Sequence, residues 1–127
     1  MTQVFDIYTI GVPVTDQQRA LDFYTDKLGL EKRADYQMRG GRRWIEVAPP
    51  RAAVTIALVP ATHEVPTGVG TGIRLKTSDA DADNSQLRVD GVDTDEVLRW
   101  PGVPPMFVFR DPDGNRLEII EASAGER

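Results

Sequence analysis

An α+β domain made of two βαβββ modules is the fold class that the sequence predicts. Two aspartates that can cap helices, Asp16 and Asp79, are 63 positions apart, close to half of the 127-residue chain. Each follows a segment with the apolar alternation of a strand and precedes a segment with helical spacing. Predicted strands greatly outnumber predicted helices, so a repeated βαβββ unit fits the pattern better than a parallel α/β sheet.

The first module is expected over residues 4–60. Val4–Val14 carries β-branched and apolar residues at alternate positions, which predicts a strand. Asp16 is suited to cap a helix, and the helical spacing then extends over Gln17–Leu28. Gly29 is well placed to end that helix.

Three further strands complete this module. Two of them, Leu30–Met38 and Arg43–Ala48, flank Arg39–Arg42, whose paired glycines predict a hairpin turn. Ala53–Val59 is the third strand. Residues 61–70, with their prolines and glycines, are expected to be a connector between the modules.

The second module is expected over residues 71–121 and repeats the order of the first. Thr71–Thr77 predicts a strand. The segment after Asp79 predicts a weaker helix that ends near Asp90–Gly91, because residues of poor helix propensity fill its first turns.

Three more strands are predicted to close the second module. Val92–Trp100 is the first, and Pro105–Arg110 is expected to pair with Arg116–Glu121 across a turn at 111–115. Residues 122–127 lack apolar anchors, so we expect them to be frayed.

Composition narrows the class of protein. The chain is 40% apolar and 28% charged, has no cysteine, and carries 20 acidic against 15 basic residues for a net charge of −5. These values exclude disulfide scaffolds and thiolate metal sites and disfavour binding to nucleic-acid phosphates. No apolar run has the ~20 residues of a membrane span, and no secretory signal is visible. We therefore expect a cytoplasmic protein that binds neither nucleic acid nor membrane, and whose acidity favours a neutral or cationic ligand.

The chain contains one histidine, His63. A 2-His-1-carboxylate iron site cannot be assembled from a single chain with one histidine. A Ser-His-Asp relay is not excluded by number alone. However, His63 lies among threonine, proline and glycine in the connector, so a solvated loop histidine is the favoured interpretation.

Three sequence motifs occur in order along the chain. They are V-P-V-T-D at 12–16, A-L-D-F-Y at 20–24 followed by K-L-G-L at 27–30, and F-R-D-P-D-G-N-R-L-E-I-I at 109–120. With the paired βαβββ layout, they resemble the vicinal oxygen chelate superfamily, which includes glyoxalase I, bleomycin-resistance proteins and extradiol dioxygenases. The resemblance implies one domain over residues 1–127 in which the two modules curve a mixed sheet around a cleft, and it implies a homodimer.

The resemblance also implies where the metal-using members place four metal ligands. In this chain the positions are Thr9, Ala57, Gly72 and Glu118. Only Glu118 has a ligand side chain, whereas a divalent first-row metal needs three or four donors. We therefore expect no metal and no other cofactor, and we assign no firm catalytic residue.

Strand alternation predicts which side chains share the cleft face with these positions. It also places Tyr8, Ile10 and Val12 under a helix. The predicted ligand-binding residues are Ile7, Thr9, Trp44, Glu46, Thr55, Ala57, Gly72, Arg74, Trp100, Phe107 and Glu118. Two of them stay open, because Trp100 fits the edge of the core as well as a ligand site, and the apolar run at 106–109 does not show which face Phe107 occupies.

Two functions follow as hypotheses. The first, which the resemblance to bleomycin-resistance proteins implies, is metal-free sequestration of an antibiotic-like aromatic or cationic small molecule stacked on Trp44. The second is a glyoxalase-like lyase or isomerase, or an oxygenase, that uses Glu118 as a proton shuttle. Structural alternatives are that Trp44 lies at a barrel rim or dimer interface, and that Glu118 pairs with Arg74 or Arg116.

Overall fold

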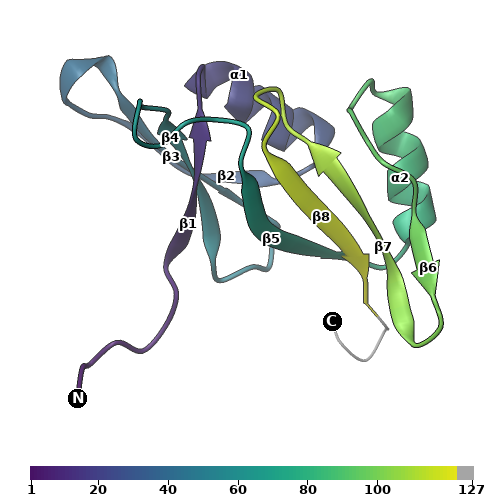
Figure 1. Cartoon of the computed structure of the whole chain (residues 1–127). Helices are drawn as coiled ribbons and strands as arrows, with labels where there is room; N and C mark the ends of the chain where they lie inside the picture. Colours follow the sequence, from purple (N-terminus) through teal and green to yellow (C-terminus); the bar gives the residue numbers. More distant parts are fainter. Residues whose placement is uncertain (123–127) are drawn as a thin grey trace. The chain divides into compact units, whose positions relative to one another are not determined.

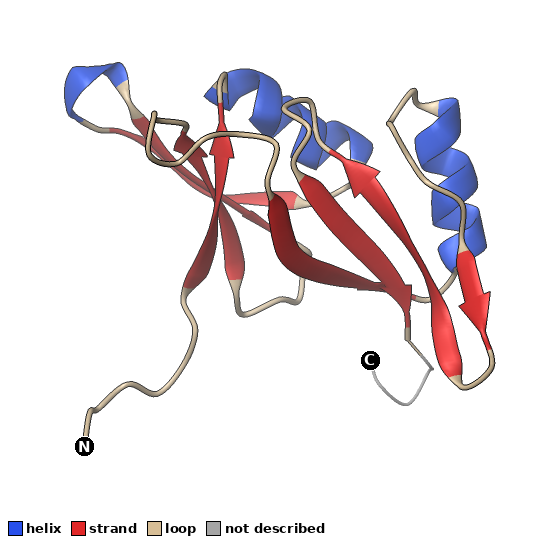
Figure 2. Cartoon of the chain, in the orientation of Figure 1, coloured by secondary structure: helices blue, strands red, loops and turns tan. Residues whose placement is uncertain are grey.

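The structure, a computed structural model, describes residues 1–122 (Figure 1). The chain divides into two compact units, Met1–Pro66 and Thr67–Arg127. Each unit contains one βαβββ series and one four-stranded mixed sheet (Figure 2). The predicted α+β class and the repeated βαβββ order are therefore confirmed.

The elements of the first unit are β1 (Thr9–Val14), α1 (Gln17–Asp22), the π-helical turn η1 (Phe23–Lys27), β2 (Glu31–Gln37), the 3-10 turn η2 (Arg39–Gly41), β3 (Arg43–Ala48) and β4 (Thr55–Pro60). They form a sheet of order β1-β4-β3-β2, in which β1 is parallel to β4 and the other pairs are antiparallel. The helix α1 contacts β3 and β4. The buried core of this unit comprises Val12, Val14, Ala20, Leu21, Phe23, Tyr24, Leu30, Ile45, Val47, Ala48, Ile56, Ala57 and Leu58.

The first strand begins at Thr9, so its predicted start at Val4 is wrong. Thr9 is the first residue of β1 with a partner, Thr55 at the start of β4. The carbonyl of Tyr8 still accepts a hydrogen bond of 3.2 Å from the backbone N–H of Thr55, but within this unit the ladder pairs no residue before Thr9. Without a ladder partner, the preceding backbone is not held as a strand. Residues 1–8 are an exposed coil that leads away from the sheet (Figure 1).

The helix predicted over Gln17–Leu28 is present, but its second half has π-helical hydrogen bonding as η1. Asp16 caps the helix, and its carboxylate accepts a hydrogen bond of 3.0 Å from the backbone N–H of Arg19. Gly29 ends the helical segment as predicted. Its φ of +75° is one that residues with a side chain rarely adopt.

Gln17 ties the start of α1 to two strands. Its Nε2 donates to the carbonyl oxygens of Arg43 at 2.7 Å and Leu58 at 2.8 Å. Its Oε1 accepts from the backbone N–H of Arg43 at 3.1 Å. One side chain thus satisfies three backbone groups and sets the position of the helix on the sheet.

The elements of the second unit are β5 (Gly70–Thr77), α2 (Ala80–Val89), β6 (Leu98–Trp100), β7 (Val103–Arg110) and β8 (Arg116–Glu121). Their sheet order, β5-β8-β7-β6, repeats the order of the first sheet, with β5 parallel to β8. The predicted pairing of the last two strands is confirmed, with Phe107 opposite Ile119 and Val108 opposite Glu118.

The strand predicted over Val92–Trp100 is short, since only Leu98–Trp100 forms β6. The chain before it is held by other groups. The side-chain Nδ2 of Asn84 donates to the carbonyl of Asp95 at 2.8 Å, and the guanidinium of Arg110 binds the Asp95 carboxylate with two hydrogen bonds. The segment touches the edge of β7 only at an isolated antiparallel bridge between Thr94 and Phe109, with backbone hydrogen bonds of 2.9 Å from Asp95 to Val108 and from Arg110 to Asp93.

The second helix, expected to be weak, is a regular helix of ten residues. Two carboxylates stabilise its start. Asp79 accepts from the backbone N–H of Ala82 at 3.0 Å, and Glu121 accepts from that of Ala80 at 3.0 Å. Neither α2 nor any other helix within residues 1–122 has the length and apolar character to cross a bilayer.

The turn at 111–115 is fixed by a buried polar network. Asp111 accepts from the backbone N–H groups of Asp113 and Asn115 and from the Asn115 side chain, each at 2.9 Å. Asn115 in turn accepts from the backbone of Gly68 and Val69 at 2.9 and 3.1 Å. The D-P-D-G-N motif therefore joins the last hairpin to the start of its own unit.

The predicted fraying at the C-terminus is wrong at its first residue. Ala122 is buried, and its backbone N–H donates to the carbonyl of Thr77 at 2.8 Å. The rest of that prediction concerns residues 123–127, which lie outside the described residues.

Candidate functional site

The structure brings four of the predicted site residues together on one face of the first sheet. β1 contributes Thr9, β4 contributes Thr55, and β3 contributes Trp44 and Glu46. Hydrogen bonds connect all four of them. Ala57 lies opposite Glu46 in the ladder and is buried.

The carboxylate of Glu46 is the centre of this group. Its Oε2 accepts hydrogen bonds from the Tyr8 hydroxyl at 2.7 Å and from Trp44 Nε1 at 2.6 Å. Its Oε1 lies 2.8 Å from the Thr55 hydroxyl, which also lies 2.8 Å from the hydroxyl of Thr9. Because a carboxylate can only accept, the Thr55 proton is donated to Glu46. The Glu46 side chain is thus satisfied by three neutral donors.

These contacts determine the protonation state of Glu46. Burial alone would raise its pKa, but hydrogen bonds from Trp44, Tyr8 and Thr55 outweigh burial and lower the pKa below the usual value for glutamate. The pKa of Tyr8 is raised, first by its hydrogen bond to Glu46 and then by burial and by the negative charge of Glu46. Glu46 is therefore ionised and Tyr8 protonated at neutral pH.

Two tyrosines that the sequence analysis missed also lie on this face. Tyr36 of β2 is paired with Trp44 across the ladder and is 57% exposed. Tyr8 is 69% exposed and reaches Glu46 from the coil before β1, so its predicted place under a helix is wrong. The hairpin register could have revealed Tyr36, whereas nothing in strand alternation predicts a residue outside the strand. We call Tyr8, Tyr36, Trp44 and Glu46 the aromatic–carboxylate face.

Two other predictions for β1 also need correction. Ile10, expected under a helix, is exposed, although Val12 is fully buried as predicted. Ile7 lies in the coil, not on the sheet face, because the strand begins two residues later. Residues 3–8, which include Ile7, line an open hollow together with Ala53.

In the second unit, Arg74 and Glu118 are paired across β5 and β8. Nε of Arg74 lies 2.8 Å from Oε2 of Glu118, so the ion pair forms with Arg74 and not with Arg116. Gly72 interrupts the β5–β8 register with a φ of +74°, and a Cβ there would contact nothing within 4 Å. The backbone therefore favours glycine at this position whether or not a ligand occupies the space beside it.

Two further predicted residues lie elsewhere in the second unit. Phe107 is 1% exposed and faces the core with Phe109, on the side of the sheet opposite Val108 and Glu118, so its assignment to the ligand face is wrong. Pairing with β8 gives the reason, because the last hairpin places Phe107 opposite buried Ile119. Trp100 is exposed on β6 and does not cover the core.

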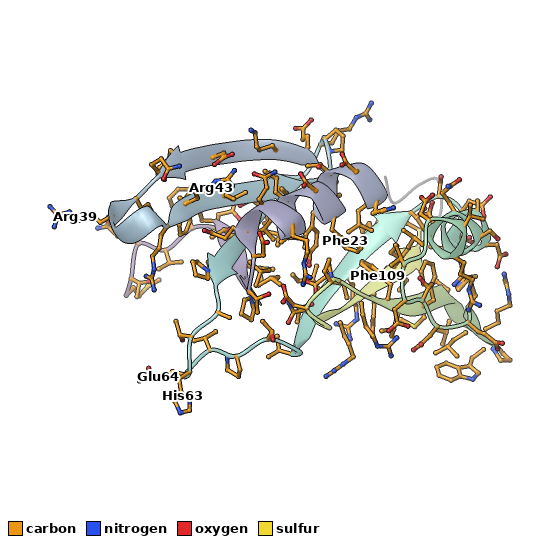
Figure 3. All side chains as sticks on the ribbon, turned by 90° about the horizontal axis from the view of Figure 1, so that it is seen from above. Phe23, Arg39, Arg43, His63, Glu64 and Phe109 are labelled. Atoms are coloured by element: carbon orange, nitrogen blue, oxygen red, sulfur yellow. The ribbon has the colours of Figure 1, made fainter. Side chains whose placement is uncertain are left out.

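Three labelled side chains of the surface loops point away from the sheets of the described residues (Figure 3). His63 and Glu64 point outward from the connector, and Arg39 points outward from the turn η2 (Figure 3). His63 is exposed, which agrees with a solvated loop histidine.

The four positions at which metal-using relatives carry ligands do not fit a metal in this chain. The hydroxyl of Thr9 is hydrogen-bonded to Thr55, Ala57 and Gly72 have no donor atom in their side chains, and Glu118 is paired with Arg74. Within residues 1–122 no three His, Cys, Asp or Glu side chains come together as ligands would have to. A divalent ion needs more donors than these residues supply.

The repeated βαβββ topology and the sequence motifs agree with a comparison to known families. The family model of the Glyoxalase/Bleomycin resistance protein/Dioxygenase superfamily matches residues 6–119. The chain belongs to this superfamily. Its resemblance to the vicinal oxygen chelate proteins, inferred from the sequence, is thereby confirmed.

Solved structures and curated relatives of the superfamily cover nearly the whole chain. TnmS3, an antibiotic binding protein from Streptomyces sp. CB03234, is 34% identical, with a TM-score of 0.85 and coverage of 97% of this chain and 100% of that one. A superfamily member from Sphaerobacter thermophilus DSM 20745 is 32% identical, with a TM-score of 0.86 and coverage of 95% and 100%. The protein YetH of Bacillus subtilis (strain 168) is 32% identical over 91% of this chain and 97% of its own length.

Proposed function

We propose that this protein binds and sequesters a small molecule with a planar aromatic part, and that it does so without metal and without chemical conversion. The observation that carries the proposal is the aromatic–carboxylate face. There a buried, ionised Glu46 fixes Trp44 and Tyr8 through hydrogen bonds of 2.6 and 2.7 Å. The name of TnmS3, an antibiotic binding protein at 34% identity, supports the same class of function.

An aromatic ligand fits this face for two reasons. Trp44 and Tyr36 lie next to each other on paired strands, so their rings offer adjacent apolar surface for stacking. The hydrogen bond to Glu46 also restricts the Trp44 ring before any ligand arrives. A fixed ring loses less conformational entropy on binding than a mobile one.

The charge of the face favours a neutral or cationic ligand over an anionic one. Glu46 carries a full negative charge that neutral donors stabilise but do not cancel. The chain as a whole carries a net charge of −5. An aromatic cation is attracted both by this charge and by the faces of electron-rich rings.

Sequestration explains the site better than proton transfer. The lowered pKa of Glu46 keeps it ionised at neutral pH, whereas a general acid or base works best with a pKa near the operating pH. Glu118, the proton shuttle of the enzymatic alternative, is held in an ion pair with Arg74. Turnover of the methylglyoxal–glutathione hemithioacetal, with or without added zinc or nickel, would favour the enzyme instead. We also propose that the protein is cytoplasmic and forms a homodimer.

Binding can be tested with three tricyclic probes of similar size and different charge: cationic 9-aminoacridine, neutral acridone and anionic anthracene-9-carboxylate. In a Trp100→Phe background the remaining tryptophan, Trp44, reports binding by fluorescence. We expect the cationic and neutral probes to quench it and to raise the melting temperature. The gain in stability should be about 2.7 kcal/mol at a probe concentration a hundredfold above Kd.

Two variants separate the roles of the ring and of its hydrogen bond. Trp44→Ala should weaken binding about tenfold or more, measured by calorimetry, whereas Trp44→Phe should retain part of it because the stacking surface is kept. Trp100→Phe should bind like the unaltered chain. If none of the three probes quenches Trp44 or shifts the melting temperature, the proposal is wrong.

A further inference from the structure

We propose that a small cavity in the second unit is a binding site for an uncharged polar group that carries an N–H or O–H donor next to a carbonyl, such as a primary carboxamide. The inference rests on the proposed function, since it assumes that the chain binds small molecules. The cavity has a volume of about 120 Å³ and is lined by Gly70, Gly72, Ile73, Val108, Arg116 and Glu118.

Glu118 supplies the acceptor of this site. Its Oε2 is shielded from solvent and lies against Nε of Arg74 at 2.8 Å. The side chain as a whole is nevertheless 30% exposed, and it lines the cavity. No side chain within residues 1–122 donates an aligned hydrogen bond to this carboxylate. Glu118 therefore has acceptor capacity left for a donor from a molecule bound in the cavity.

Arg116 supplies the donors. Its guanidinium lies directly against the backbone of Gly70, where a Cβ would come within 3.2 Å of Nη2. One of its five N–H groups makes a long hydrogen bond of 3.4 Å to the carbonyl of Gly68. The other N–H groups are left for an acceptor in the cavity. A bound group that both donates to Glu118 and accepts from Arg116 matches the two side chains at once.

The charges around the cavity disfavour a cationic group, and the need to donate to Glu118 excludes a carboxylate, which can only accept. Glu118 is already neutralised by Arg74, and Arg116 adds a second positive charge at the rim. A cationic group would meet two guanidinium groups and one carboxylate, so it is disfavoured. This preference is opposite to that of the aromatic–carboxylate face, where Glu46 has no cationic partner within residues 1–122.

The walls and the size of the cavity limit the group to a few heavy atoms. Ile73 and Val108 provide apolar sides, and Gly72 leaves open space where a side chain would otherwise project. A water molecule takes about 30 Å³ of liquid volume, so this cavity admits a carboxamide but not a fused ring system. The rest of such a ligand would lie outside the cavity mouth.

Three probes of equal size test the preference: benzamide, benzamidine and acetophenone. Benzamidine replaces the neutral carboxamide by a cation, and acetophenone keeps the carbonyl but lacks the donor. Binding is followed by the amide shifts of Gly70, Gly72 and Ile73 in nitrogen-15 NMR spectra of the full chain. We expect benzamide to shift these amides with a Kd about tenfold lower than either of the other probes. Equal or tighter binding of benzamidine, or no shift at these amides with any probe, would overturn the inference.

Variants assign the effect to the two charged partners of the cavity. Glu118→Met, which removes the acceptor and keeps the length of the side chain, should weaken benzamide about tenfold, and Glu118→Gln should weaken it less because an acceptor oxygen remains. Arg74→Gln should leave benzamide binding in place and improve benzamidine, because the carboxylate then has no cation. Glu96→Gln removes an exposed acid outside the lining of this cavity and should change neither.

The outcome is distinguishable from that of the proposed function. Binding of the tricyclic probes that depends on Trp44, without a benzamide shift at Gly70 and Gly72, would refute the cavity site and leave the proposed function intact. Shifts with benzamide that Glu118→Met does not reduce would equally refute the assigned acceptor. In each variant the spread of the amide spectrum reports whether the fold is retained.

Discussion

Glu46 is a carboxylate buried in the sheet of the first unit without a cationic partner within residues 1–122. Tyr8, Trp44 and Thr55 each donate one hydrogen bond to it. Hydrogen bonds to a charged acceptor are roughly twice as strong as neutral ones, which explains how the charge is retained despite burial. The same hydrogen bonds hold the side chains of Tyr8 and Trp44 in place. The ionisation of Glu46 and the positions of these two rings therefore depend on each other.

The pH dependence of stability tests this arrangement. Because the folded-state pKa of Glu46 is lowered, its contribution to stability is fully present above the unfolded pKa of about 4.3 and is lost as the pH falls through the lower folded-state value. Glu46→Gln should cost about 1–3 kcal/mol at pH 7 by denaturant unfolding. The difference from the unaltered chain should shrink toward pH 3. Glu64→Gln, at an exposed position of the connector, is the control, and a difference for Glu46→Gln that does not change with pH would contradict the assignment.

At the residue scale the sequence predicted part of the candidate site. Strand alternation placed Thr9, Trp44, Glu46 and Thr55 on one face, because a period of two leaves only one register that buries the aliphatic residues. Phe107 could not be oriented in this way, since both faces of its strand are apolar. Its position is decided by pairing with β8.

The two helices show how element starts follow from local sequence. Each begins after an aspartate whose carboxylate accepts from a backbone N–H three residues later, at 3.0 Å for both Asp16 and Asp79. Their lengths agree with the predictions, but their regularity does not. The first changes to π-helical bonding over Phe23–Lys27, and the second is stabilised by Glu121, a residue distant in sequence.

The caps give a matched pair of substitutions. Asp16→Ala and Asp79→Ala should each lower the free energy of unfolding by about 1 kcal/mol, because each leaves a helix N–H without its acceptor. Asp16→Asn and Asp79→Asn keep the acceptor and should cost only a few tenths. Chemical denaturation of the four variants measures both effects. An alanine variant as stable as its asparagine counterpart would show that the cap hydrogen bond contributes nothing.

At the scale of the whole molecule, the chain contains the same topology twice. The two sheets have equivalent strand orders, and each unit has its own buried residues. Each unit comprises about half of the 127 residues. A domain of about 60 residues buries only about 60% of its unfolded surface and is marginally stable alone. We therefore predict that the two units unfold together as one domain.

The two tryptophans allow this prediction to be measured. Trp44 lies in the first unit and Trp100 in the second, so the variants Trp100→Phe and Trp44→Phe each leave one reporter. Urea unfolding should give coincident fluorescence transitions once each curve is corrected for the stability of its own variant by circular dichroism. Two midpoints within one variant, one by fluorescence and one by circular dichroism, would show that the units are separate domains.

The order of elements, both helix caps and the turns were predictable from the sequence, because capping, alternation and turn chemistry act over a few neighbouring residues. The superfamily followed from the resemblance of three sequence motifs to those of known members. Tertiary structure decided where β1 begins, how much of the segment before Trp100 is a strand, and which tyrosines reach Glu46. A strand is stable only beside another strand with which it pairs. The pairing of β1 with β4 begins at Thr9, whose partner is Thr55. A side chain such as Tyr8 joins a site through contacts 38 positions away in sequence, which no local pattern encodes.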